Sequence, residues 1–371
     1  MATKQDKSAD ARRLEMVRLC HRGLDSRTLR AELLQYLQTV IPFDFAYFST
    51  TDPATQLGTS SVLVEEPPAW FMSLFVENEY LQPDYIKFHD MLRQNQFVAL
   101  LSEATRNELQ LSQRYRDMLA PINMKDELRA AFVNDKSCWG ILCLHADITY
   151  GEREASFIAS LAPHIADGLR KSLLLETANI TETSDAPGVL ILTDDLSVVA
   201  MTAAAEYWLA ELSQAEQPTN APLPVAVRSV VAGLQAIERG TMPLYSTPKV
   251  RICVPSGQWL VLYASRLKQS DIQSQISVVF EVAQPAEITP IIMQAYRLTK
   301  RETEIAHCVL RGWSTGEIVT QLHISSNTVQ DHLKAIFEKV DVSSRGELAA
   351  RIFTKQYLPH YKASFSGDSS S

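Results

Sequence analysis

Residues 298–348 read LTKRETEIAHCVLRGWSTGEIVTQLHISSNTVQDHLKAIFEKVDVSSRGEL and contain three candidate helix-capping boxes. In each box the cap hydroxyl can accept from a helical N–H, and a Glu three positions later can accept from the N–H of the cap residue. The three cap residues are Thr299, Ser314 and Ser344. A fourth cap, Ser325, has Thr328 in place of Glu, and Gly312 stands where the first helix must stop. The stretch predicts four short helices with a helix-turn-helix at their centre.

The helix that begins after Ser325 has two chemically different faces. At about 100° per residue, one sector holds the apolar side chains of Val329, Leu333, Ile336, Phe337 and Val340. Another sector holds the polar side chains of Asn327, Gln330, Asp331, Lys334 and Glu338. The apolar face is predicted to pack in a core, and the polar face is either solvated or available for recognition.

The order of these motifs resembles a LuxR-type (GerE-like) helix-turn-helix over about one seventh of the chain. The residues that carry the resemblance are Leu298-Thr299, Arg301-Glu302, Gly312, Ser314, Glu317-Ile318, Ile324-Ser325, Thr328-Val329, His332-Leu333, Ile336-Phe337, Val342, Ser344-Arg345 and Glu347-Leu348. The resemblance implies that the helix after Ser325 enters the major groove of double-stranded DNA and that the last helix forms a dimer contact. It further implies that Gln330, Asp331 and Lys334 face the bases. Asn327 and Thr328 would lie near the phosphates.

The chemistry of these side chains suits base recognition. Gln can pair with adenine, Lys with guanine, and a carboxylate with the amino group of cytosine. Many family members carry Lys where this chain has Gln330, and Asp331 places a negative charge near phosphates, which weakens non-specific attraction. Affinity is therefore expected to depend on geometry and on dimerisation.

The charge of the chain is unevenly distributed. Residues 297–360 carry nine Lys or Arg against seven Asp or Glu, a net charge of +2. Because the whole chain has a net charge of −8, the rest of the chain carries −10. An acidic body repels DNA, which leaves the C-terminal module as the expected DNA contact. The acidic body is a candidate sensor or scaffold, and its charge is equally explained by solubility alone.

Composition is that of a multidomain globular protein without a membrane segment. The 371 residues are 46% hydrophobic, enough for two or three cores, and no run approaches the roughly 18 apolar residues of a membrane span. Five scattered cysteines without a C-x-x-C indicate neither a disulfide framework nor a zinc site. Since the N-terminus also lacks an apolar signal region, we expect a cytoplasmic protein. Nucleophile-elbow, phosphate-loop, dinucleotide and metalloprotease motifs are lacking, so we expect that it is not an enzyme and has no cofactor.

Two breaks predict three domains and a tail. A polar stretch ending in Pro187-Gly188 reads as a linker, and a helix over Ile288–Arg297 is expected to connect to the DNA module. The predicted boundaries are 12–176, 186–284 and 288–360, with a disordered tail over 361–371.

The first two domains are both predicted to be α+β. The first has a helix, two strands, an apolar run and a long helix, over Leu29–Ile41, Asp44–Ser49, Ser60–Glu65, Ser137–Ala146 and Gly151–Leu173. Its order resembles a GAF domain. The second has strands on both sides of Asp194-Asp195, a hairpin over Val250–Tyr263 and a strand over Ile276–Val282, and it resembles a PAS domain. The two Asp residues are expected to form a turn between antiparallel strands, not a phosphoacceptor.

Candidate ligand contacts in the first domain are Trp70, Tyr80, Asp84 and Tyr85, because their segment resembles the pocket segment of acyl-homoserine-lactone receptors. The spacing departs from that pattern, and an aromatic stripe is more often core than pocket. Cys143 and His145 share a strand face in a geometry compatible with a metal or haem. A pair without further ligands favours packing, so no metal is predicted.

The sequence thus predicts a homodimeric transcription regulator that responds to a small molecule or a partner. A change of register in Phe157–Leu173 or Ile288–Arg297 would alter the spacing of two recognition helices. The alternative is an interaction or adaptor protein that uses the Gln330, Asp331 and Lys334 face against another protein. The effector, the target DNA, the sign of regulation and a sensing or spacing role for the middle domain are left open.

Overall fold

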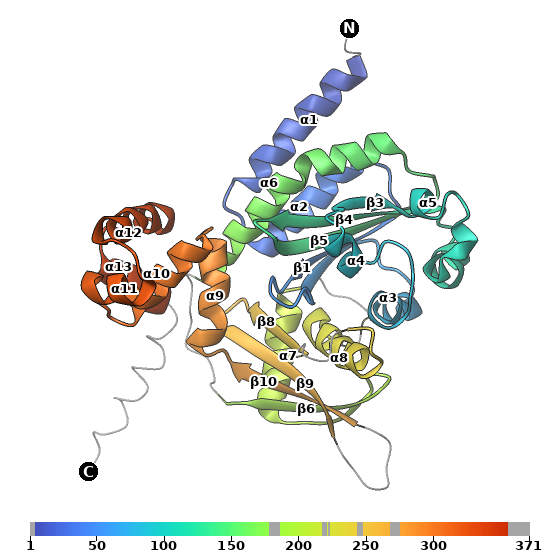
Figure 1. Ribbon diagram of the computed structural model, residues 1–371. Coiled ribbons are helices and arrows are strands. Elements are labelled where there is room, and N and C mark those ends of the chain that lie inside the picture. The colour runs from blue at the N-terminus through green and yellow to red at the C-terminus, as the bar shows by residue number, and fades with distance from the viewer. Residues whose placement is uncertain are drawn as a thin grey trace.

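A computed structural model describes residues 4–177, 186–216, 221, 223–242, 248–267 and 275–354. It contains two antiparallel sheet domains and a C-terminal helical domain that lies to one side of them (Figure 1). Most of the predicted linker, residues 178–185, and all of the predicted tail, residues 361–371, lie outside the described residues.

The first sheet has five strands in the order β2-β1-β5-β4-β3. Their bounds are β1 Phe45–Thr51, β2 Gly58–Val64, β3 Val98–Leu100, β4 Asp126–Asn134 and β5 Ser137–Ala146. Every residue of the central strand β5 is buried, because both faces of the sheet are covered. This explains why its sequence is a continuous apolar run and does not alternate.

Helices cover both faces of this sheet. One face packs against α1 (Lys4–Cys20), α2 (Ser26–Gln38) and α6 (Glu152–Glu176). The other face packs against α3 (Ala69–Leu81), α4 (Phe88–Arg93), α5 (Leu101–Ala104) and three short turns, η1 (Leu109–Leu111), η2 (Tyr115–Leu119) and η3 (Ala120–Ile122). The predicted α+β character of this domain is confirmed.

The second sheet has the order β7-β6-β10-β9-β8, all antiparallel. Its strands are β6 Gly188–Thr193, β7 Val198–Met201, β8 Lys249–Cys253, β9 Trp259–Leu267 and β10 Gln275–Val282. The predicted hairpin is present, and Gly257 in its turn has φ 81°, a conformation that glycine adopts without strain. Two helices, α7 (Ala203–Gln214) and α8 (Val225–Glu238), complete the core of this domain.

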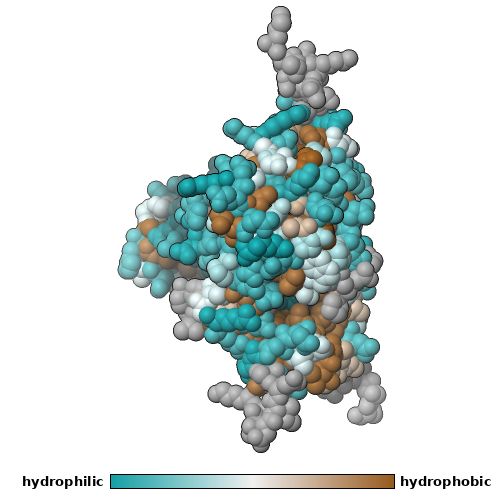
Figure 2. All heavy atoms as spheres, turned by 90° about the vertical axis from the view of Figure 1, so that its right-hand side faces the viewer, coloured by the Kyte–Doolittle hydropathy of each residue, from teal (hydrophilic) through white to brown (hydrophobic). Residues whose placement is uncertain are grey.

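The edge strand β7 exposes apolar side chains, among them Val198, Val199 and Met201. Figure 2 shows hydrophobic side chains gathered on the lower part of one face of the molecule. The Asp194-Asp195 turn joins β6 to β7, as expected, and Asp195 accepts hydrogen bonds from the hydroxyls of Thr193 and Ser197.

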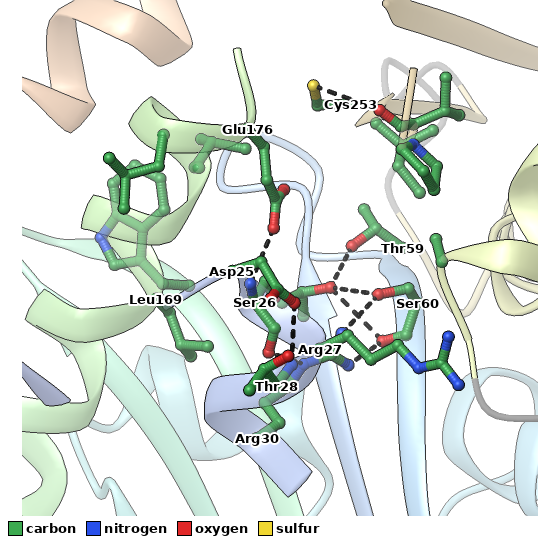
Figure 3. A pocket seen from close by; sticks show the side chains of 18 of the residues that line it. Asp25, Ser26, Arg27, Thr28, Arg30, Thr59, Ser60, Leu169, Glu176 and Cys253 are labelled. Carbon is green, nitrogen blue, oxygen red and sulfur yellow. Dashed lines mark hydrogen bonds between the residues drawn. The ribbon is translucent and has the colours of Figure 1, made fainter. Parts of the chain in front are cut away.

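The two sheet domains pack closely against each other through α8. A Cβ on Gly58 of β2 would lie 3.0 Å from side-chain atoms of Val225 and Ser229, so the helix touches the strand backbone. A cross-domain ion pair joins Asp52 to Arg251 through contacts of 2.9 and 3.0 Å. Beside this contact the domains line an open cavity of about 950 Å³ (Figure 3).

The helix that leads into the C-terminal domain differs from its prediction. It is α9 (Pro285–Ala295), which begins three residues earlier than Ile288 because proline is favoured in the first turn of a helix. It ends before Arg297, which has φ 56°. Its apolar side chains, Ile288, Ile291 and Ile292, are buried against the hairpin residues and α6, so α9 is part of the body and does not bridge it from outside.

The C-terminal domain consists of α10 (Lys300–Leu310), α11 (Thr315–Leu322), α12 (Ser326–Val340), α13 (Arg345–Ala349) and the π-helical turn η4 (Ala350–Thr354). The four α-helices are the predicted ones, and all five elements contribute to one apolar cluster. Among the described residues, we find no helix with the length and apolar character that crossing a bilayer requires.

Candidate nucleic-acid interface

The first two capping boxes of the C-terminal domain form as predicted. The Thr299 hydroxyl accepts from the Glu302 N–H at 3.3 Å, and the Thr299 N–H donates to the Glu302 carboxylate at 2.7 Å. Ser314 and Glu317 repeat both contacts at 3.3 and 2.7 Å. Gly312 follows α10 with φ +80°, the left-handed conformation expected where a helix stops.

The third predicted box is wrong in one of its two bonds. The Ser344 hydroxyl accepts from the Glu347 N–H at 3.1 Å, as expected. The Glu347 carboxylate, however, accepts from the N–H of Ser343 at 2.7 Å and not from that of Ser344. The bond pattern shifts by one residue, and Ser344 still begins α13.

The turn between α11 and α12 is tight and well anchored. His323 ends α11 in the left-handed conformation, with φ 53°, and Ser325 caps α12 by accepting from the Thr328 N–H at 3.1 Å. Arg301 of α10 donates to the Leu322 carbonyl at 2.8 Å. These bonds hold α11 and α12 in a helix-turn-helix.

Helix α12 has the two faces predicted from its sequence. Val329, Leu333, Ile336 and Val340 are at most 3% exposed, and Phe337 is partly buried against the same cluster. The polar residues on the other side are exposed, namely Asn327, Gln330, Asp331, Lys334 and Glu338. The polar face is therefore open to a partner.

The five predicted DNA contacts lie along this open face. Asn327 and Thr328 are in the first turn of α12, and the Thr328 hydroxyl lies 2.9 Å from that of the cap residue Ser325. Gln330 and Lys334 border an open groove of about 370 Å³ between α12 and the start of α13. Gln330 makes a long contact of 3.5 Å to the Thr315 hydroxyl, which leaves its amide free to rotate toward a base edge.

A lysine at the end of α12 fixes the helix to the chain that enters the domain. Lys339 pairs with Glu302 at 2.6 Å and donates to the Arg297 carbonyl at 3.1 Å. Although burial raises the pKa of Glu302, the hydrogen bonds from Lys339 and Thr299 outweigh it and hold that pKa below its ordinary value. The orientation of α12 is thereby tied to Arg297.

Arg297 is tied in turn to the body of the molecule. Its guanidinium lies 3.0 Å from the carboxylate of Asp167 in α6. Arg170, on the next position of the same helix face, donates to the carbonyl of Ala295 at the end of α9. Burial alone would raise the pKa of Asp167, but Lys171, Arg170 and Arg297 lower it to about 2. Helices α6 and α9 therefore meet where the C-terminal domain attaches.

The four candidate ligand contacts in the first domain are not brought together around one cavity. Trp70 is 41% exposed and contacts the ring of Phe71. Tyr80 is half-buried and lines a small cavity of about 100 Å³. Asp84 and Tyr85 belong to a buried polar network with Arg114.

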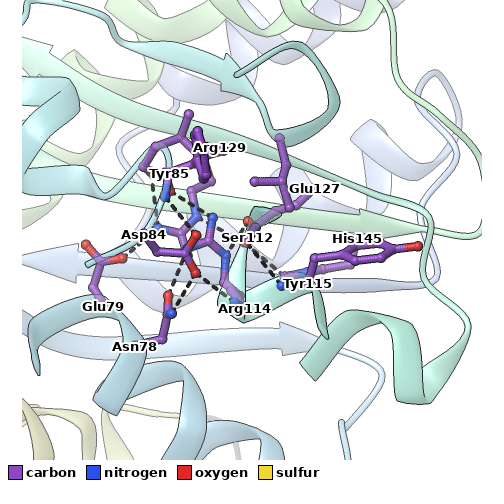
Figure 4. A network of polar contacts seen from close by, with 12 residues as sticks. Asn78, Glu79, Asp84, Tyr85, Ser112, Arg114, Tyr115, Glu127, Arg129 and His145 are labelled. Carbon is purple, nitrogen blue, oxygen red and sulfur yellow. Dashed lines mark hydrogen bonds and ion pairs between the residues drawn. The ribbon is translucent and has the colours of Figure 1, made fainter. Parts of the chain in front are cut away.

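That network was not anticipated from the sequence (Figure 4). Arg114 and Arg129 are fully buried, and each lies within 3.0 Å of a carboxylate oxygen of Glu127. Arg129 also pairs with Glu79 at 2.6 Å, and the N–H of Arg114 donates to Asp84 at 2.7 Å. Burial raises the pKa of Glu127, yet the two guanidinium groups lower it to about 2. Three carboxylates and two guanidiniums thus form one buried ionic cluster.

Glu127 also joins the two residues considered as metal ligands. Ligand atoms of Glu127, Cys143 and His145 lie within 4.8 Å of one another, all buried. Burial raises the pKa of the Cys143 thiol and lowers that of His145 to about 4. At pH 7 the thiol therefore keeps its proton and the imidazole is uncharged. Since two guanidinium cations already occupy the Glu127 carboxylate, the group does not fit a metal cation. The imidazole packs against Phe45 instead.

The C-terminal segment matches a known family. The model of the family "Bacterial regulatory proteins, luxR family" matches residues 296–352. Three curated relatives are an HTH-type transcriptional regulator in the exeN 3' region of Aeromonas salmonicida, UhpA of Escherichia coli and DesR of Bacillus subtilis. They are 34%, 41% and 36% identical over 95, 56 and 67 residues, which are 24%, 15% and 18% of this chain. The chain spans 48%, 29% and 34% of their lengths, less than half of each.

Solved structures are similar to this chain at low identity. The ligand-binding domain of VqsR from Pseudomonas aeruginosa has a TM-score of 0.31 at 16% identity and covers 46% of this chain and 98% of its own. SdiA from Escherichia coli has a TM-score of 0.30 at 13% identity and covers 91% and 94%. The family match defines the C-terminal domain as a LuxR-type helix-turn-helix domain.

Proposed function

We propose that this protein is a sequence-specific DNA-binding transcription regulator that works as a homodimer in the cytoplasm. The observation that carries the proposal is the match of residues 296–352 to a family of bacterial regulators, combined with the exposed polar face of α12. Helix α12 inserts into the major groove, since a helix of this exposure and polarity fits that groove.

The side chains of this face have distinct roles in the proposal. Lys334 donates to guanine, and Gln330 pairs with adenine once it leaves Thr315. Asp331 accepts from the amino group of cytosine and disfavours bases that present an acceptor at that position. Asn327 and Thr328 sit at the N-terminus of α12, where backbone N–H groups and the helix dipole favour phosphate.

The two sheet domains form the regulatory part, a GAF-like domain over 12–176 and a PAS-like domain over 186–284, ahead of a DNA-binding domain that follows α9 and contains the matched residues 296–352. Control passes through the junction of α6 and α9, where Asp167 holds Arg297 and the Arg297 carbonyl accepts from Lys339 of α12. A shift of α6 against α9 moves Arg297 and so changes the angle at which α12 is presented. In a dimer this angle sets the distance between two half-sites.

Selection from randomised DNA duplexes tests the proposal. Full-length protein is expected to enrich a two-fold symmetric site at moderate salt, with affinity that falls as salt rises. Lys334→Ala should lower affinity for that site by about tenfold to a hundredfold. Arg153→Ala, which removes the same charge from an exposed position on α6, is the matched control and should bind like the unaltered protein.

An interaction protein with a solvated or protein-binding α12 gives a different result. Folded protein would then enrich no duplex, with or without its N-terminal domains, and Lys334→Ala would change nothing. The presence of Asp331 on the polar face is the feature that such a role would explain.

A further inference from the structure

The open cavity between the two sheet domains has the size of a site for a small organic molecule. Its volume is about 950 Å³, and both sheet domains and α9 contribute to its wall. Figure 3 shows the start of α2, with Arg27 and Arg30, beside Thr59 and Ser60 of β2, and Glu176 at the end of α6 directed toward it. The class of molecule that fits depends on which wall groups a ligand can reach.

Part of the wall is apolar and open to solvent. Leu175, near the end of α6, is 45% exposed, and Leu173 of α6, Ala31 of α2 and Ala215 after α7 are half-buried. A molecule that covers these side chains removes their apolar surface from water, which favours binding. This side of the cavity therefore suits the apolar body of a small molecule.

The guanidinium of Arg27 is the cation of the wall that a ligand can reach. Arg27 is exposed, and it extends from α2 to the second domain, where it donates to the Gln214 carbonyl at 3.1 Å. No carboxylate lies within ion-pair distance of it in the part of the chain that the structure describes. The neighbouring Asp25 carboxylate caps α2 by accepting from the Thr28 N–H at 2.9 Å. Most of the donors of Arg27 are therefore available to an acceptor.

A second guanidinium adds positive charge behind this part of the wall. Arg30 is completely buried and donates to the carbonyls of Ser26, Phe48 and Ser60 and to the Ser60 hydroxyl, all of them uncharged acceptors. Within the described ranges it has no carboxylate at ion-pair distance either. A ligand in the cavity cannot touch Arg30. Its charge still acts through the low-dielectric wall and attracts an anion.

The other charged groups of the wall oppose an anion only weakly. Arg251 pairs with Asp52 at 2.9 Å, and Glu32 pairs with Arg22 at 3.0 Å. Burial raises the pKa of Glu176 to about 7, although a backbone hydrogen bond and a nearby guanidinium oppose this. Below pH 7 this carboxyl group is therefore mostly uncharged and does not repel an anion.

The cavity touches the two helices that hold the C-terminal domain. On α6, Leu173 lies one turn after Arg170, which bonds to the Ala295 carbonyl of α9. On α9, Ile291 lies one turn before Ala295 and also lines the cavity. A bound molecule therefore lies against both helices. Only a ligand with different affinity for two arrangements of those helices can shift one into the other.

We propose that this interdomain cavity is the effector site, and that it takes a small organic anion whose carboxylate pairs with Arg27 and whose apolar body lies against Leu173, Leu175 and Ala215. The regulatory role of the site rests on the function proposed above, whereas binding itself does not. The bound anion links the first domain to the second at Arg27 and lies against α6 and α9 beside the Asp167–Arg297 pair.

Binding is tested by titration calorimetry on the full chain with 1-naphthaleneacetate and with its uncharged amide, 1-naphthaleneacetamide. We expect saturable binding of one acetate per chain and an affinity for the amide that is about threefold to tenfold lower, because the pair with Arg27 is partly open to solvent. Arg27→Gln should lower the affinity for the acetate to that for the amide. Arg153→Gln, at an exposed position of α6 outside the wall, is the matched control and should leave both affinities unchanged.

A second pair of variants places the ligand in the cavity. Ala215→Trp adds bulk to a half-buried position of the wall and should weaken binding of acetate and amide about tenfold. Ala159→Trp, on an exposed position of α6 outside the wall, should weaken neither. If Ala215→Trp fails to fold by circular dichroism, Arg27→Gln decides the matter, since Arg27 is exposed. Absence of saturable acetate binding, equal affinity for the amide, or full affinity in Arg27→Gln overturns the proposed site.

The regulatory role has its own readout. Affinity for the selected DNA duplex is measured with and without saturating 1-naphthaleneacetate in the unaltered protein and, at the same concentration, in Arg27→Gln. A change that is smaller in the variant supports an effector site, and an unchanged affinity at full occupancy overturns the regulatory role. Site-specific acetate binding without DNA selection by the chain removes the proposed function and leaves the ligand site. DNA selection without site-specific acetate binding does the reverse.

Discussion

The two sheet domains have the same strand order and differ in how they bury charge, since an ionic cluster lies beneath the first sheet, whereas Glu216 and Arg228 of the second domain bond to backbone groups. In each sheet the order is second, first, fifth, fourth and third strand of the domain. The first sheet covers a cluster in which Arg114, Glu127 and Arg129 are completely buried. The second sheet covers aliphatic side chains and Trp208. Strand order therefore does not determine which side chains are buried beneath a sheet. The stability of an ionic interior depends on the geometry of its charge pairs, whereas that of an apolar interior depends on how well its volume is filled.

The largest expected effect comes from breaking the ionic interior. Arg129→Met leaves Glu79 and Glu127 without a guanidinium that lies 2.6 and 3.0 Å from them. Because buried carboxylates lose both water and partner, we expect a loss of about 3–5 kcal/mol in the free energy of unfolding, measured with urea. Arg153→Met on the surface should change it little. A loss below about 1 kcal/mol for Arg129→Met would mean that the cluster is replaceable.

Shortening one side chain in the second domain should cost slightly less. Leu262→Ala removes a completely buried side chain of β9 and leaves a cavity, for an expected loss of about 3 kcal/mol. The loss should be the same at pH 5 and pH 7, since no ionised group is created or exposed. A loss that changes with pH would contradict the description of this interior as apolar.

Acid should destabilise the first interior. Burial lowers the pKa of His145 from 6.5 to about 4 despite the nearby Glu127, so the unfolded chain takes up a proton first as the pH falls. Stability is therefore complete above pH 6.5 and decreases by roughly 2–3 kcal/mol on approach to pH 4. His145→Phe should flatten that decrease in urea unfolding between pH 7 and pH 4.5. Glu127, with its pKa lowered from 4.5 to about 2, extends the loss below pH 4.5.

The carboxyl group of Glu176, at the domain boundary, is expected to change the stability with pH in the opposite direction. The pKa of Glu176 is raised from 4.5 to about 7, so the folded chain holds a proton that the unfolded chain releases. Its favourable contribution is present below pH 4.5 and is lost as the pH rises through 7, by roughly 1–2 kcal/mol because the group faces an open cavity. Glu176→Gln should change the difference in unfolding free energy between pH 5 and pH 8 by that amount, in favour of pH 8, relative to the unaltered protein. An unchanged difference would show that Glu176 does not contribute and would leave the pH dependence to His145 and Glu216.

The smallest effect is expected in the C-terminal domain, where polar groups are satisfied locally. Ser325→Ala removes the hydroxyl that accepts from the Thr328 N–H, for a loss of about 1 kcal/mol. Ser326→Ala, one residue later and exposed, is the matched control. The stability of this domain can be measured by hydrogen exchange of the α12 backbone amides. Equal effects of the two variants would show that the cap contributes nothing.

Local structure could be predicted from the sequence where the bonded residues are close to each other in the chain. The caps at Thr299, Ser314 and Ser325, the burial of one face of α12 and the hairpin turn at Gly257 were all predicted and are confirmed. The residues assigned to DNA recognition stay a prediction, and all of them except the half-buried Thr328 are exposed. The box at Ser344 was wrong in one bond because a neighbouring N–H competes for the same carboxylate.

Contacts between distant residues were not predictable in the same way. Glu79, Arg114 and Glu127 lie in a helix, a turn and a strand, and no spacing pattern in the sequence predicts that they contact one another. The four candidate ligand residues were grouped because their segment resembles a receptor pocket segment, whereas Trp70 is exposed and the carboxylate of Asp84 is buried beside Arg114. The cavity needs two domains and α9 to exist at all.

The sequence by itself determined the C-terminal helix-turn-helix, since each of its helices begins at a hydroxyl that bonds within three residues and buries one face at a fixed period. It also determined that two sheet domains precede it, through runs of apolar residues between turns. Only the tertiary structure decided that Asp167 pairs with Arg297, that two arginines lie beneath the first sheet, and that residues of both sheet domains line a common cavity. The physical reason is that these contacts form only after the elements have packed, and their energies depend on burial that no local pattern encodes.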